Sequence, residues 1–123
     1  MSNDGAESGR RAEAAVADYL VANGFDVLAR NLRLGALELD IVARRGALVV
    51  VVEVRTRGPT AFQTAFESVT VEKRARLHKA VERLWREKLG AMTDVERVRI
   101  DVAAVTFAGE RTAVEYVEGA IDG

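Results

Sequence analysis

Residues 35–57 read G-A-L-E-L-D-I-V-A-R-R-G-A-L-V-V-V-V-E-V-R-T-R, and this stretch decides the fold. Both halves are rich in Val, Leu and Ile, which favour strands, and Gly46 supplies the permissive backbone that a tight reversal needs. The stretch therefore predicts two strands joined at residues 44–46. The second strand is apolar on both faces from Ala47 to Val52, which is typical of a strand that is covered on both sides of a sheet.

Each of the two strands carries acidic residues within its apolar run. Side chains alternate between the two faces of a strand, so Glu38 and Asp40 are expected on the face opposite Leu39 and Ile41. Glu53 directly follows the apolar run of the second strand. A carboxylate at the end of such a buried strand is costly unless a positive charge lies beside it.

Composition limits the kinds of protein that this chain can be. A chain of 123 residues, 49% hydrophobic and 30% charged, is long enough for one domain with a core, and too short for two. It contains no apolar run near the ~20 residues of a membrane span, and residues 1–10 lack the apolar segment of a signal peptide. We therefore expect a cytoplasmic protein that does not contact a membrane.

The chain has no cysteine and a single histidine, which excludes disulfides and leaves too few ligands for a zinc site of the usual His/Cys kind. Any metal ion would be held by oxygen. The net charge of −1 gives no general attraction to nucleic acid, so binding would require local clustering of the 18 Lys and Arg residues.

The remaining hydrophobic patterns predict the other elements. Apolar residues recur at helical spacing in two segments and alternate in three others. We expect helices over residues 8–22 and 70–89, and strands over residues 25–34, 97–107 and 112–117. Residues 1–7 are expected to form a disordered tail, and residues 8–123 a single domain. The predicted fold is an α/β mixed sheet flanked by helices, in the order αβββαββ.

Asp40 and Glu53 are the first candidates for chemistry. They lie near the ends of neighbouring strands, where their carboxylates can come close and would repel each other. A divalent cation removes that repulsion, and oxygen ligands with open water positions suit Mg²⁺ or Mn²⁺. Such an ion can activate a water molecule and polarise a phosphodiester, while Arg55, two residues beyond Glu53, would stabilise charge on the phosphate.

A purely structural explanation of the same residues stays open. Glu53 could pair with Arg55 or Arg57, and Asp40 with Arg99 or Lys73, without any metal ion. The spacing D-x(12)-E-x-R does not decide between the two explanations.

Several motifs between about Gly9 and Asp101 resemble the YraN-like family, which has the restriction-endonuclease-like fold and is similar to archaeal Holliday junction resolvases. The motifs are G-R-R-A-E-A-A-V-A-D-Y-L, N-G-F-D-V-L-A-R-N, L-E-L-D-I-V, V-V-E-V-R-T-R and R-I-D-V. The resemblance implies a metal site of the PD-(D/E)xK type. In that site Asp40 matches the aspartate, Glu53 the second acid and Glu13 a helix-borne glutamate, and the backbone carbonyl of Val54 is a further metal ligand.

The chain departs from the family pattern at Arg55, which occupies the position of the usual lysine. Arginine keeps the charge but is effectively never deprotonated, so it can hold a phosphate and cannot exchange a proton.

Together these patterns and the family resemblance favour a Mg²⁺- or Mn²⁺-dependent nuclease, with Asp40, Glu53 and Arg55 as catalytic residues. The resemblance implies that it acts on DNA, including branched or structured DNA. We expect four further residues to contact the nucleic acid: Arg30, Arg33, Arg57 and Lys73. The alternative is a catalytically inactive module that binds nucleic acid or another protein on the same fold. Because related resolvases act as dimers, the resemblance also allows a homodimer.

Overall fold

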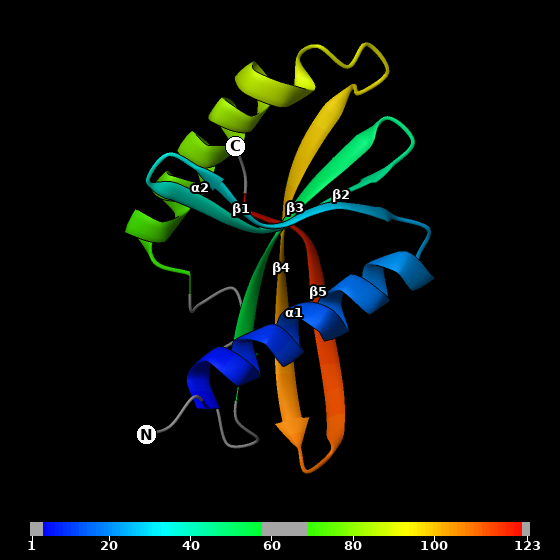
Figure 1. Cartoon of the computed structure of the whole chain (residues 1–123), viewed down its shortest axis with the longest axis vertical. Coiled ribbons are helices and arrows are strands. Elements are labelled where there is room, and N and C mark those ends of the chain that lie inside the picture. Colours follow the sequence, from blue (N-terminus) through cyan, green and yellow to red (C-terminus); the bar gives the residue numbers. More distant parts are fainter. Residues whose placement is uncertain (1–3, 58–68, 122–123) are drawn as a thin grey trace.

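The computed structural model describes residues 4–57 and 69–121, and its elements are labelled in Figure 1. The described residues form a five-stranded mixed sheet flanked by two α-helices, in the order αβββαββ that the sequence predicted. A π-helical segment, Trp85–Leu89, directly follows the second helix. The bounds are α1 Asp4–Ala22, β1 Asp26–Leu34, β2 Leu37–Arg45, β3 Leu48–Arg57, α2 Val71–Leu84, β4 Arg97–Ala108 and β5 Arg111–Ile121.

The strands lie in the sheet in their sequence order, with β3 at the centre and β1 and β5 at the two edges. The β3 and β4 strands are parallel, and the other three pairs are antiparallel. A parallel pair cannot be joined by a tight turn, and α2 lies in the connection between β3 and β4. The predicted hairpin over residues 37–57 is therefore confirmed, and it forms the centre of the fold.

The two faces of β3 are covered by different helices. Val50 and Val52 pack in a cluster with α1, whereas Val49 and Val51 pack in a cluster with α2. All four valines are 0% exposed, and burying each of them contributes about 2 kcal/mol. The apolar run on both faces of this strand thus correctly indicated a three-layer arrangement, in which the helices lie on opposite sides of the twisted sheet (Figure 1).

The first helix is longer than predicted. It begins at Asp4, so residues 4–7, which we placed in the tail, are helical, while residues 1–3 lie outside the described part of the chain. Ala12, Val16 and Leu20 of its apolar stripe are 0% exposed and pack on the sheet.

The second helix begins within one residue of the predicted start, with Thr70 as its cap, and ends before the predicted end. The Thr70 side chain accepts a hydrogen bond from the Lys73 backbone N–H at 3.2 Å, which satisfies one of the free donors at the helix start. The α-helical pattern ends at Leu84, and the π-helical segment follows. Val71 and Trp85 continue the apolar spacing of this helix in the sequence, yet they are 77% and 40% exposed. Neither α1 nor α2 has the length and apolar character of a membrane-crossing helix, and the same holds for every helix among the described residues.

In the hairpin of β1 and β2, the side chains that face a given helix change from one side of the sheet to the other along its length. This corrects the prediction that Leu39 and Ile41 share a face. Leu39 lies in the cluster with α2, whereas Ile41 lies in the cluster with α1. Asn31 on β1 has a φ of 52° and lies between the pairs Arg30 with Ile41 and Leu32 with Leu39. A left-handed residue interrupts the regular alternation of a strand, so the hairpin turns from one side of the sheet toward the other at this point.

Candidate functional site

The candidate site forms where β2 and β3 separate. Their pairing runs to Ile41 with Val52 and no further. The next residue of β2 is Asp40, whose carboxylate Oδ2 accepts a hydrogen bond from the Val54 backbone N–H at 2.9 Å. The aspartate side chain therefore takes the place of a backbone carbonyl, which fixes its orientation at the opening between the two strands.

A pocket of about 290 Å³ opens beside this fork. It is lined by residues of three elements: the N-terminal half of α1, β2 at Asp40, and the end of β3. Its lining residues are Gly9, Ala12, Glu13, Asp40, Val54, Arg55 and Thr56. Four of the residues that the sequence assigned to the site, Glu13, Asp40, Val54 and Arg55, thus share one pocket.

Glu13 forms a hydrogen bond with a residue that was not among the predicted site residues. Asn31 Nδ2 donates a hydrogen bond to Glu13 Oε1 at 3.0 Å. This contact joins α1 to β1 across 18 residues of sequence. The only hint in the sequence was the tolerance of asparagine for left-handed backbone, which by itself predicts no contact.

Glu53 is buried at 2% exposure and has two cationic neighbours. Its Oε2 lies 3.3 Å from Arg55 Nη1 and 3.5 Å from Lys73 Nζ. Alternation along β3 puts Glu53 on the side covered by α2, which carries Lys73 in its first turn. A positive charge near the start of a helix is disfavoured by the helix dipole. This was the one signal in the sequence that Lys73 has a partner outside its own helix.

The electrostatics of Glu53 are dominated by burial. Loss of solvent raises the pKa of its carboxyl from 4.5 to about 7, and the charge of Asp40 and a hydrogen bond with it act in the same direction. Lys73 and Arg55 lower the pKa, but by less than these causes raise it. The two acids therefore form a close pair that two cationic side chains do not neutralise.

The structure brings the three predicted acids together only in part. Asp40 shares a pocket with Glu13 and interacts with Glu53, so it links the other two. Among the residues that the structure describes, however, no three His, Cys, Asp or Glu side chains form a ready group of metal ligands. Part of the structural alternative is also present, because Glu53 pairs with Arg55. Lys73, which that alternative placed beside Asp40, forms its ion pair with Glu53.

The predicted nucleic-acid contacts have different surroundings. Arg30 and Arg33 are exposed on the edge strand β1, and Arg33 Nε lies 3.7 Å from Glu38 Oε2. Lys73 forms the ion pair with Glu53 described above. The side chain of Arg57 lies outside the described part of the chain.

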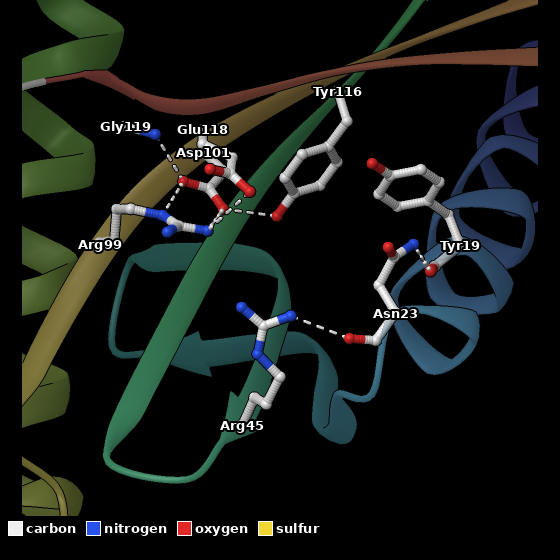
Figure 2. Close-up of polar contacts among 8 residues, drawn as sticks. All are labelled: Tyr19, Asn23, Arg45, Arg99, Asp101, Tyr116, Glu118 and Gly119. Carbon is white, nitrogen blue, oxygen red and sulfur yellow. Dashed lines mark hydrogen bonds and ion pairs between the residues drawn. The ribbon is translucent and has the colours of Figure 1, made fainter.

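Asp101, a second buried acid, belongs to a separate network on β4 and β5 (Figure 2). Its carboxylate accepts hydrogen bonds from Arg99 Nε at 2.8 Å and Arg99 Nη2 at 3.0 Å, from the Tyr116 hydroxyl at 2.5 Å, and from the Gly119 backbone N–H at 2.7 Å. Asp101 is 0% exposed, and Arg99 is thus its partner and not that of Asp40. The R-I-D-V motif is explained by this link between two strands.

Tyr116 extends this network toward α1. Its ring stacks on that of Tyr19, with centroids 4.9 Å apart, as Figure 2 shows. Burial and the hydrogen bond to Asp101 raise the pKa of its hydroxyl well above the usual range, so Tyr116 stays neutral and acts as a donor. The network is fully satisfied and lies apart from the pocket, and we assign it to stability.

Comparison with known proteins identifies the family. The profile of the uncharacterised protein family UPF0102 matches residues 12–105. A UPF0102 protein of Sorangium cellulosum is 47% identical over 114 residues, covering 91% of this chain and 78% of that protein. Another, from Acidothermus cellulolyticus, is 39% identical over 120 residues and covers 91% of both chains. Among solved structures, the chain is similar to Pyrococcus furiosus SfsA in complex with Ca²⁺, with a TM-score of 0.44 and 15% identity over 89% of this chain and 62% of that one. The matched family profile and these relatives show that the chain belongs to the UPF0102 family, to which its resemblance to YraN-like proteins pointed.

Proposed function

We propose that this protein is a Mg²⁺- or Mn²⁺-dependent nuclease that acts on DNA, with Asp40 and Glu13 as the central carboxylate ligands. The observation that carries the proposal is the close pair of the buried Glu53 and the partly exposed Asp40. The pKa of Glu53 stays at about 7 although Lys73 and Arg55 lie beside it, so the pair holds more negative charge than its surroundings stabilise. A cation at the neighbouring pocket would relieve this excess.

The donor chemistry of the pocket suits a hard cation. Its candidate ligands are all oxygens, from the Glu13 and Asp40 carboxylates and the backbone carbonyl of Val54. Mg²⁺ is usually held through one or two carboxylates, several waters and substrate phosphates, so it does not need a group of three acids. Glu53 would act from beside Asp40, by adding negative charge that strengthens binding of the cation.

Each residue of the site has a definable part in phosphodiester hydrolysis. A bound divalent cation supplies electrostatic stabilisation of the charge that builds up on the phosphate. The Val54 N–H orients Asp40, and the fixed positive charge of Arg55 is suited to binding a phosphate oxygen. Since Arg55 does not exchange protons at neutral pH, proton transfer would fall to water or to the carboxyl groups.

A binding module without turnover is the second candidate. It is favoured by Arg55 at the position of the usual lysine, and by the ion pairs that already engage Glu53. In this function the acid pair and its cations would shape a surface for nucleic acid, and no strand would be cut.

Calorimetric titration with MnCl₂ tests the metal site. Binding is expected for the native protein and should be lost or strongly weakened in Asp40→Asn, while Glu38→Gln, an exposed acid on the same strand, should bind as the native protein does. Absence of binding to the native protein, or undiminished binding by Asp40→Asn, would exclude the site.

Incubation with DNA then separates the two functions. With Mn²⁺ present, the native protein is mixed with linear, nicked and four-way DNA at low salt, where phosphate contacts are strongest. A nuclease yields cut strands from at least one of these substrates, and Asp40→Asn yields none. Retardation of the DNA without cutting by a protein that binds Mn²⁺ establishes the binding module instead.

A further inference from the structure

Asn31 has a backbone conformation that requires an explanation. Among the described residues it is the only one other than glycine with a positive φ, at 52°. It lies inside β1, between residues that pair normally with β2 on either side, and not in a turn. Left-handed backbone costs about 1 kcal/mol for a residue with a side chain, so a compensating contact is expected.

That contact is made with the candidate site. The register places Asn31 opposite the position of Asp40 on β2, since its neighbours pair with Leu39 and Ile41. From there its Nδ2 donates to Glu13 Oε1 at 3.0 Å. The left-handed backbone and the short side chain of Asn31 together direct its amide N–H at one carboxylate oxygen of Glu13. Glu13 shares the pocket with Asp40.

We propose that Asn31 is a positioning residue that holds the Glu13 carboxylate in the pocket, oriented to bind a divalent cation together with Asp40. This inference rests on the proposed metal-dependent function. One Glu13 oxygen is engaged by the amide, so the orientation of the carboxylate is fixed before the cation arrives. Residues that orient metal ligands in this way typically change metal affinity about 10- to 100-fold when they are removed.

Asn31→Gly tests the proposal because glycine adopts the same backbone freely and removes only the amide. We expect it to weaken Mn²⁺ binding about tenfold in calorimetry. In a Glu13→Gln background, the same substitution should change Mn²⁺ affinity little, because its effect passes through the Glu13 carboxylate. Asn23→Gly is the matched control: it removes another exposed asparagine amide, which donates to the Tyr19 carbonyl at the far end of α1 (Figure 2), and should leave Mn²⁺ affinity unchanged.

Native affinity in Asn31→Gly, or an equal loss in the Glu13→Gln background, would overturn the positioning role. The contact itself is tested without metal by the NMR resonances of the Asn31 side-chain amide, which should shift in Glu13→Ala. Unchanged resonances overturn the inference even if the native protein binds Mn²⁺. If the resonances shift but the native protein binds no Mn²⁺, the metal-dependent function fails, and the contact is only a tie between α1 and β1.

Discussion

The ionisation of Glu53 should destabilise the folded protein. Its carboxyl is 2% exposed, and burial together with the Asp40 charge raises its pKa from 4.5 to about 7. In the unfolded chain the same group is solvated and titrates near its ordinary value. Between pH 4.5 and 7 the folded protein therefore binds more protons than the unfolded protein.

The sign of the pH dependence follows from this difference. Where the folded state binds more protons, the free energy of unfolding falls as the pH rises. The contribution of Glu53 to stability therefore decreases from about pH 4.5 to about pH 7 and is level above that window. The difference between a pKa of 4.5 and one of about 7 corresponds to a loss of about 3 kcal/mol in the free energy of unfolding. This loss is net of the attraction to Lys73 and Arg55, which already lowers the pKa.

Glu53→Gln isolates the effect because glutamine resembles the protonated acid at every pH. Urea unfolding followed by circular dichroism should give similar stabilities for the native protein and Glu53→Gln at pH 5. At pH 8.5 the variant should be more stable by about 3 kcal/mol. Other titrating groups are common to both proteins, so they cancel in the comparison.

Glu38→Gln serves as the control, because Glu38 lies at the surface and its ion pair with Arg33 is exposed. Its effect should stay within about 0.5 kcal/mol at both pH values. The reasoning is refuted if the difference between Glu53→Gln and the native protein is the same at pH 5 and pH 8.5, since Glu53 would then titrate alike in both states.

Three further substitutions test the scaffold by urea unfolding at pH 7. Asp101→Asn should cost about 3 kcal/mol, because it leaves the nearly buried charge of Arg99 without its partner; a loss below about 1 kcal/mol would contradict the assigned network. Thr70→Ala should cost about 1 kcal/mol through loss of the helix cap, and Thr70→Ser should restore most of it. Val52→Ala should cost about 2 kcal/mol by leaving a cavity at the centre of the sheet, and an unchanged stability would show that the site collapses freely.

Local patterns were sufficient to predict the elements and their order. The apolar run of β3 and the helical spacing of apolar residues in α1 each depend on residues close together in sequence, and both predictions were confirmed. The ends of helices were less predictable. Trp85 continues the apolar spacing of α2 in the sequence, but the change to π-helical geometry follows Leu84 and leaves Trp85 40% exposed.

Features that depend on contacts across the fold could not be predicted in the same way. The alternation of β2 suggested that Leu39 and Ile41 face one side, and the left-handed Asn31 on the neighbouring strand breaks that rule. The hydrophobic pattern has no signal for such a residue. The ion pair of Lys73 with Glu53 likewise requires α2 to fold back on the sheet, so spacing along the chain could indicate only that Lys73 lacked a local partner.

The two buried acids of this fold show why the proposed site is more than a structural ion pair. Asp101 accepts four hydrogen bonds, and its removal should weaken the protein, as expected for a group that serves stability. Glu53 is buried almost as deeply, yet its pKa of about 7 means that its charge opposes folding. A neutral glutamine would make a more stable protein at the same position. A charge that is held at a cost to stability, next to a pocket lined by two more carboxylates, is typical of a site that binds a cation.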